Sequence, residues 1–559
     1  MTADLCLRGG RVLDVFSGTF RRLDVSITAG RIVSLSERPA RETVNANGQW
    51  IVPGLIDAHV HLESSHLTPT EFARTVVPRG TTTVIADPHE VANVCGVTGV
   101  RALLRAARGL PLRVFFMAPS CVPAAPFGTA AARLGPSEVA EILSWDDVLG
   151  LGEVMNAPGV LRGDKDLLAK LGLAAGRPID GHAPGLRGDD LAAYIAAGPR
   201  TDHESTTLEE AEEKLAYGMH VLVRESSAAR NLHDLLPLLT DRSASHVHFC
   251  TDDRSAETLV REGHMDAIVR AALREGALPE RVLAAATIHA ARAYGLRDLG
   301  AVAPGYRADL ALVSDLKAFR PHAVYTAGRL AAQEGESVTP FSEIALDELL
   351  DTVHVRPFDA RDLRIPAPPS RDVTARVIGV VPNQILTESR RASPAVREGY
   401  ASADPGRDVL KVAVFDRHTA SGRIGLGFVS GFGLHRGALA STVAHDAHLL
   451  VVVGVSDDDI TLAARTVIAS GGGQAVVADG EVLASLALPL AGLLSRRPAR
   501  EVAAAEAALR SAAHSLRSPL PDPFATLSFL ALPVIPHLRL TDEGLVDVDR
   551  FERVPLYEQ

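Results

Sequence analysis

The alternation of short apolar runs with longer helical stretches between residues 51 and 298 most constrains how this chain can fold. Eight apolar runs there have the composition of buried strands, and segments between them, such as 97–108 and 208–217, have helical spacing. Eight strand–helix units over roughly 240 residues predict an α/β fold, the (β/α)₈ barrel. Such barrels carry their chemistry where the strands end. The predicted strands end at His61, Asp87, Ala118, Glu153, His182, His203, Glu225 and Asp252.

The segments on either side of the predicted barrel have a different pattern. Residues 1–50 alternate apolar and polar side chains between glycine-containing turns, and residues 299–345 repeat that style. We expect these two segments to form one small β-sandwich beside the barrel at 51–298. A proline-rich stretch at 365–370 marks a linker. Beyond it, we expect residues 371–559 to form a C-terminal α+β domain.

Length and composition narrow the class of protein. A chain of 559 residues is long enough for two to four domains. The net charge of -11 argues against electrostatic binding to nucleic acid or to an anionic membrane. We find no signal-peptide pattern and no apolar run of about eighteen residues. With four scattered cysteines, these features predict a cytoplasmic protein without membrane or nucleic-acid partners.

Three residues at the predicted strand ends could bind a first metal ion. His59 and His61 are two positions apart on a strand, so both imidazoles face the same side and can bind one divalent ion. Glu153 ends a later strand, and a carboxylate there could bridge two ions about 3.5–4 Å apart. The alternatives are a histidine pair on a solvated face and a buried carboxylate in an ion pair.

Three further strand-end residues extend this pattern to a second ion. His182 and His203 follow consecutive strands and would hold the second metal, although a single histidine at such a position is more often a core residue. Asp252 would contact the first metal and exchange a proton with its water, with the adjacent Asp253 as a rival for this role. We therefore expect two divalent ions, Mn²⁺ or Fe²⁺, with Zn²⁺ as an alternative.

The motifs around these residues resemble the amidohydrolase superfamily, and more closely its adenine deaminases. A bridging glutamate distinguishes this resemblance, because many superfamily members use a carboxylated lysine there, and the nearest downstream lysine, Lys165, is out of register with the strand end. The similarity covers nearly the whole chain. The matching stretches are 52–65, 79–93, 150–156, 180–185, 201–204, 250–253, 437–446, 528–536 and 540–548.

The resemblance implies hydrolysis of adenine to hypoxanthine and ammonia in purine salvage. We hypothesise that a metal-bridging hydroxide attacks C6 and that Asp252 passes its proton to the leaving amine. Two alternatives remain, namely an amidohydrolase acting on a different purine or a cyclic amide, and a scaffold without catalytic activity. The complete set of potential ligands argues against the scaffold.

Several other polar residues near the strand ends are candidates for substrate chemistry. Ring N1 needs an acid, which we assign to Glu204, with Glu90, Glu63 and Glu225 as alternatives. Support of a metal ligand is an equally good interpretation of each of these. The candidate substrate contacts are Asp253, Glu90, Asp87, His89 and Arg224.

A polar cluster in the C-terminal region lies beside an apolar strand. We interpret His445, Asp446 and His448 as a surface turn, with the alternative that they reach over the barrel mouth of the same or a neighbouring subunit. The domains outside the barrel favour assembly into a homo-oligomer. We also expect a helix at 500–516 in this region.

Overall fold

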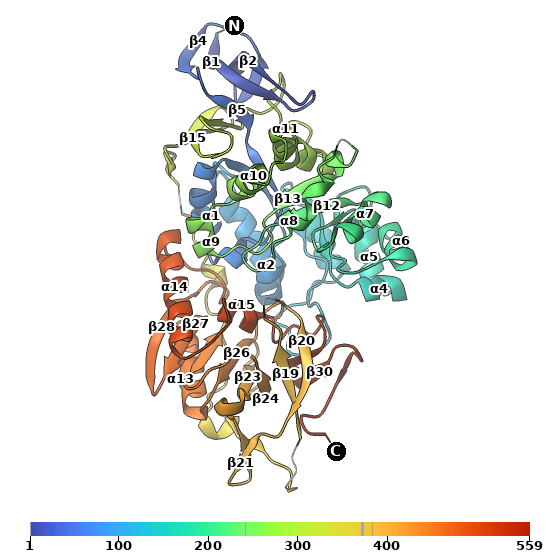
Figure 1. Ribbon diagram of the computed structural model, residues 1–559, viewed down its shortest axis with the longest axis vertical. Coiled ribbons are helices and arrows are strands. Elements are labelled where there is room, and N and C mark those ends of the chain that lie inside the picture. The colour runs from blue at the N-terminus through green and yellow to red at the C-terminus, as the bar shows by residue number, and fades with distance from the viewer. Residues whose placement is uncertain (1, 241, 342, 370–373, 383, 559) are drawn as a thin grey trace.

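The computed structural model describes residues 2–240, 242–341, 343–369, 374–382 and 384–558. The expected first residue of the C-terminal domain, 371, and the chain ends at 1 and 559 lie outside the described residues. Figure 1 shows three parts along the long axis, with an N-terminal sheet at the top, a curled parallel sheet with helices in the middle, and the C-terminal part below. The parallel sheet is the part that positions the polar strand ends.

The middle part confirms a barrel-like core with additional domains. Hydrogen bonds join β6 through β10 in one parallel series and β11 through β13 in another. A parallel bridge between Val60 and Asp252 brings the last strand back to the first, and β10 packs beside β11. The strands are β6 (Leu55–Val60), β7 (Thr81–Ala86), β8 (Arg113–Ala118), β9 (Val148–Val154), β10 (Ile179–Gly181), β11 (Thr201–Asp202), β12 (His220–Arg224) and β13 (Val247–Cys250).

Helices alternate with these strands and cover the outside of the barrel, which is why every residue of β6 and β7 is buried. The segment expected at 97–108 begins earlier, at His89, with a kink where Gly96 has a left-handed φ of 58°. The helices are α1 (Pro69–Val76), α2 (His89–Ala107), α3 (Pro136–Leu143), α4 (Ala157–Arg162), α5 (Lys165–Leu173), α6 (Gly188–Ala196), α7 (Leu208–Ala216), α8 (Leu232–Leu235), α9 (Ala256–Arg261), α10 (Met265–Arg274), α11 (Pro279–Ala284) and α12 (Ala290–Ala293).

The two segments that flank the barrel share one sheet. Nine strands of the described chain form it, in the order β17-β16-β15-β14-β5-β1-β2-β3, with β4 paired to β1. β5 joins the segments, because it pairs with β1 on one side and with β14 on the other. The strands are β1 (Ala3–Asp14), β2 (Thr19–Thr28), β3 (Arg31–Ser34), β4 (Ala40–Asn45), β5 (Trp50–Pro53), β14 (Leu310–Val313), β15 (Pro321–Thr326), β16 (Arg329–Gln333) and β17 (Glu336–Ser337).

The C-terminal part is built on a mixed sheet in the order β20-β19-β24-β23-β26-β25-β27-β28. Its strands are β19 (Ala375–Val380), β20 (Thr387–Ala392), β23 (Leu410–Phe415), β24 (Ile424–Ser430), β25 (Ala438–Ser441), β26 (Leu450–Gly454), β27 (Gly473–Ala478) and β28 (Glu481–Ala487). Two three-stranded sheets accompany it: β18 (Ile365–Pro366), β22 (Tyr400–Ser402) and β21 (Ala395–Arg397), and β29 (Leu538–Thr541), β30 (Gly544–Asp547) and β31 (Glu552–Arg553).

One helix of the C-terminal part lies against the barrel. The expected helix at 500–516 is α14 (Ala499–Ser515), which packs on α9 of the barrel (Figure 1). The others are α13 (Asp457–Ala469) and α15 (Pro523–Ser528). In the part of the chain that the structure describes, no helix combines the length and the apolar character needed to cross a membrane.

Candidate metal centre

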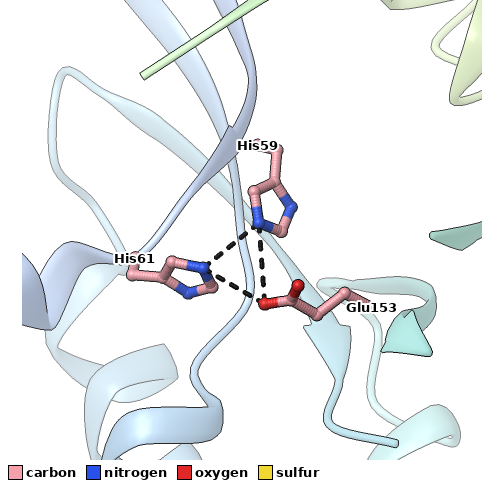
Figure 2. Close-up of side chains that lie close together, drawn as sticks. All are labelled: His59, His61 and Glu153. Carbon is pink, nitrogen blue, oxygen red and sulfur yellow. Dashed lines mark hydrogen bonds and ion pairs between the residues drawn. The ribbon is translucent and has the colours of Figure 1, made fainter. Parts of the chain in front are cut away.

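Two histidines and a glutamate meet at the carboxyl ends of the barrel strands. Figure 2 shows His59 of β6, His61 just after it and Glu153 of β9 pointing toward one another. The Nε2 atoms of the two histidines are 3.2 Å apart. Glu153 Oε1 lies 3.2 Å from His61 Nε2 and 3.9 Å from His59 Nε2. Each of these side chains is buried, so the three potential ligand atoms converge away from solvent.

The second oxygen of Glu153 faces a different pair of histidines. His182 and His203 directly follow β10 and β11. Glu153 Oε2 lies 2.7 Å from His182 Nδ1 and 3.5 Å from His203 Nε2. One carboxylate therefore stands between two histidine pairs and presents one oxygen to each. This is the arrangement that a ligand bridging two metal ions requires.

Asp252 completes the first cluster. Its Oδ1 lies 3.2 Å from His61 Nε2 and 3.8 Å from His59 Nε2. The residue has a left-handed φ of 54°, and its N–H donates to the carbonyl of His59 at 3.0 Å. That conformation is uncommon outside glycine, although aspartate tolerates it. Arg224 Nη1 donates to the other oxygen, Oδ2, at 3.0 Å, which leaves Oδ1 directed at the histidines.

The ring orientations show that this donor set fits cations. His61 Nδ1 lies 3.0 Å from the backbone oxygen of Asp87. A ring nitrogen facing a carbonyl carries the proton, so Nε2 presents its lone pair to His59 and Glu153. Lone pairs and carboxylate oxygens that crowd together in a buried site need a positive charge between them. Two groups of three ligand atoms, each within 4.8 Å, fit two divalent ions: His59, His61 and Glu153, and Glu153, His182 and His203.

Asp87 and His89 support this centre from the loop after β7. Asp87 Oδ2 accepts a hydrogen bond of 2.8 Å from the backbone N–H of Glu153. His89 Nδ1 lies 3.4 Å from Glu153 Oε1, and its Nε2 lies 3.3 Å from Glu90 Oε1. These contacts orient the central carboxylate, and the predicted role of both residues in substrate binding stays a prediction.

Glu204 is held in an ion pair with Arg224. Arg224 Nη2 donates to Glu204 Oε2 at 3.2 Å, and Nη1 contacts Oε1. Burial acts to raise the pKa of Glu204, but the positive charges of Arg224, His182 and His203 together outweigh it and hold the pKa below its ordinary value. An ionised, ion-paired carboxylate is a weak proton donor. The role of Glu204 as the acid stays a prediction, and this contact counts against it.

The other candidate acids differ in how their oxygens are used. Glu63 Oε1 accepts from the N–H of Val91 at 3.1 Å, while its Oε2 is buried without a hydrogen-bond partner among the described residues. Glu225 Oε1 accepts from the N–H of Leu232 at 3.0 Å. Asp253, a predicted substrate contact and not one of these acids, accepts a hydrogen bond from the Ser64 hydroxyl. Glu63 thus keeps one oxygen without a hydrogen-bond partner among the described residues.

The interpretation of His445, Asp446 and His448 as a surface turn is wrong. Asp446 is 4% exposed and His448 is fully buried. His445 Nδ1 lies 2.7 Å from Glu90 Oε1, and His448 Nε2 contacts Glu90 Oε2. The alternative, a reach to the barrel mouth of the same subunit, is the one observed. The buried apolar strand β26 beside the cluster was the available sequence signal.

Comparison with known proteins supports the class that the fold and the donor set define. Residues 50–331 match the amidohydrolase family. Residues 384–552 match the adenine deaminase C-terminal domain. A barrel-like core with histidine and carboxylate side chains at its strand ends, together with the first match, defines an amidohydrolase.

Relatives that align with nearly the whole chain identify the family within the amidohydrolases. The chain is 49% identical over 560 residues to the adenine deaminase of Methanothrix thermoacetophila, and the alignment covers 100% of this chain and 97% of the relative. It is 48% identical over 553 residues to the adenine deaminase of Nitratidesulfovibrio vulgaris, with 98% and 95% covered. Adenine deaminase 2 of Carboxydothermus hydrogenoformans is 46% identical over 557 residues, with 99% and 97% covered. The chain belongs to the adenine deaminase family.

Proposed function

We propose that this protein hydrolyses adenine to hypoxanthine and ammonia and so serves purine salvage. The observation that carries the proposal is the position of Glu153, which presents one oxygen to each of two histidine pairs. The named activity of relatives that are 46–49% identical over nearly the whole chain supplies the substrate class.

The metal ligands follow from the two clusters. His59, His61 and Asp252 would hold one ion, His182 and His203 the other, and Glu153 both. Mn²⁺ and Fe²⁺ suit this mixture of imidazole and carboxylate, and Zn²⁺ is the alternative. Divalent ions bound there would supply a water whose pKa is lowered to about 7, so that it can lose a proton at neutral pH.

Asp252 is the group placed to move protons. During hydrolysis a water oxygen becomes bonded to C6, one water proton must leave, and the amine must gain a proton before the C6–N bond breaks. Asp252 Oδ1 faces the first histidine pair, and Arg224 holds Oδ2. The carboxylate therefore accepts the water proton through Oδ1 and returns it to the leaving amine.

Ring N1 gains a proton as water adds to C6, and a second acid has to supply it. That acid regains a proton when the C6 hydroxyl loses its own and the carbonyl of hypoxanthine forms. Glu204 was the assignment from sequence, but its ion pair with Arg224 favours the ionised form. We therefore favour Glu63, whose Oε2 has no hydrogen-bond partner among the described residues and which lies in the turn after His61. Glu204 then orients Arg224, and through it Asp252.

The organisation of the chain remains part of this proposal. We infer a unit from residues 1–50 and 299–345, a barrel at 51–298, and a C-terminal α+β domain from about residue 371. The shared sheet of β1, β5 and β14 supports the first grouping. A cytoplasmic location and a homo-oligomeric state complete the proposal, and size-exclusion chromatography with light scattering tests the latter.

The test of the function is ammonia release from a panel of purines and cyclic amides by protein reconstituted with Mn²⁺ or Fe²⁺. Adenine should be the preferred substrate, with hypoxanthine as the product. Activity on guanine or hydantoin without activity on adenine would support the alternative amidohydrolase. Absence of activity on every compound, with no bound metal, would support the scaffold.

A further inference from the structure

One short turn of the C-terminal domain, residues 444–448, is fixed at the barrel mouth. The N–H of His445 donates to the carbonyl of Ser528 at 2.8 Å. Arg417, which is fully buried, donates through Nε to the carbonyl of His448 and through Nη2 to the carbonyl of Ala491 at 3.0 Å. A buried guanidinium that bonds to carbonyls in separate loops holds those loops in one relative position. The 444–448 turn is therefore placed by the interior of its own domain.

The 444–448 turn docks on the barrel through Glu90. Both oxygens of this carboxylate are engaged, one by His445 at 2.7 Å and the other by His448. Glu90 lies in the first turn of α2, which begins at His89, and His89 Nδ1 lies 3.4 Å from Glu153 Oε1. The turn is thus connected to the candidate metal centre through Glu90 and His89.

Asp446, inside this turn, is a buried carboxylate with an open hydrogen-bonding position. It is 4% exposed, and its Oδ2 accepts no hydrogen bond from any residue that the structure describes. Its Oδ1 lies 3.9 Å from His445 Nδ1, which is already engaged by Glu90. Burial raises the pKa of Asp446 to about 6. A buried carboxylate oxygen without a hydrogen-bond donor is costly, so the open Oδ2 beside a reaction site indicates a donor that arrives with a ligand.

We propose that Asp446 recognises the ring N–H of the five-membered ring of adenine, and so selects the free base against N-substituted purines. This inference rests on the proposed function. Adenine carries one ring N–H, on the imidazole side of the base, away from the C6 amine. With C6 at the barrel centre, that N–H faces outward, where the C-terminal domain covers the mouth.

The chemistry of the contact explains why a carboxylate stands there. An ionised carboxylate accepts the N–H in a charge-assisted hydrogen bond. A purine that carries a methyl group or a sugar on that nitrogen has no hydrogen to donate, so the carboxylate stays buried and unpaired. A site built around such a hydrogen bond strongly rejects analogues that lack the donor.

The test is Asp446→Asn in the full-length, metal-loaded protein, with kcat/KM measured for adenine and for 9-methyladenine. The wild-type protein should prefer adenine by at least about a hundredfold. Asp446→Asn should lower kcat/KM for adenine by at least about tenfold, mainly through KM, as expected for loss of one hydrogen bond to a charged group. Its preference for adenine over 9-methyladenine should shrink by the same factor, with metal content unchanged.

Asp459→Asn is the matched control, because both oxygens of Asp459 are bonded inside the C-terminal domain, to Ser456 Oγ at 2.9 Å and to the N–H of Gly480 at 3.2 Å. It should leave the preference for adenine unchanged. Wild-type selectivity in Asp446→Asn, or an equal loss in Asp459→Asn, would overturn the inference. Should Asp446→Asn fail to fold, equal rates of the wild-type protein on adenine and 9-methyladenine would also overturn it. A wild-type protein that releases ammonia from neither compound would instead reject the proposed function.

Discussion

His445 Nδ1 lies 2.7 Å from Glu90 Oε1, although 355 residues separate them in the chain. The contact ties the C-terminal domain to the first turn of α2, beside the candidate metal centre. His448 engages the other oxygen of the same carboxylate. Glu90 is therefore a buried charge that the two domains share, and the C-terminal domain lies beside the candidate metal centre.

Glu90→Gln should show whether the contact between Glu90 and the two histidines positions the site. A neutral amide cannot attract two histidines as a carboxylate does, so the 444–448 turn and His89 lose their common partner. We expect kcat/KM for adenine to fall by about 10–100-fold with metal content retained, as for other residues that orient a metal site. Glu141→Gln, on an exposed ion pair with Arg101, is the control. Wild-type kinetics in Glu90→Gln would show that the contact does not position the site.

Glu153→Gln should remove the shared ligand of both clusters. An amide supplies one weak oxygen donor where the carboxylate supplies two, so the two histidine pairs lose their link. We expect metal analysis to show a reduced content and ammonia release from adenine to be abolished. Glu336→Gln, at an exposed position, should bind metal normally. A fully active Glu153→Gln protein would contradict the bridging role.

Asp252→Asn and Asp253→Asn should distinguish two adjacent carboxylates. Asp252 faces His61 and is held by Arg224, whereas Asp253 accepts a hydrogen bond from Ser64. We expect Asp252→Asn to lower kcat by about 10²–10⁴-fold, the usual contribution of a proton-transfer group. Asp253→Asn should have the smaller effect on kcat. Steady-state kinetics at saturating adenine checks this order, and the reverse order would transfer the proton-moving role to Asp253.

Glu506, on α14 beside the barrel, should make stability depend on pH. Burial, with Asp522 and Glu257 nearby, raises the pKa of Glu506 from 4.5 to about 8. Between these values the unfolded chain releases the proton and the folded protein keeps it. The free energy of unfolding should therefore fall as pH rises through this window, by at most about 1.4 kcal/mol per pH unit from this group.

Glu506→Gln should flatten that dependence and make the protein more stable than the wild type near the upper end of the window. Urea unfolding followed at several pH values between about 5 and 8 measures both effects. Glu501→Gln, near the exposed start of the same helix, serves as the control. An unchanged slope in Glu506→Gln would mean that another group carries the pH dependence.

The barrel-like core and the polar strand ends could be predicted because they depend on local patterns. Apolar runs at regular spacing indicate buried parallel strands, and such strands end at one edge of the sheet. His59, His61 and Glu153 could therefore be grouped from sequence alone, and the structure brings them together. The first helix turn of α2 was harder to predict, because Gly96 interrupts the helical pattern.

Pairings between distant side chains were decided only by the tertiary structure. Sequence placed Glu204 and Arg224 near the site, but whether they meet depends on how neighbouring strands align. The 444–448 turn was mistaken for a surface feature because its polar residues have their partners in another domain. Local composition thus determined the barrel and its candidate ligands. Burial and long-range contact determined which carboxylates are paired and which, like Asp446, keep an oxygen open for a ligand.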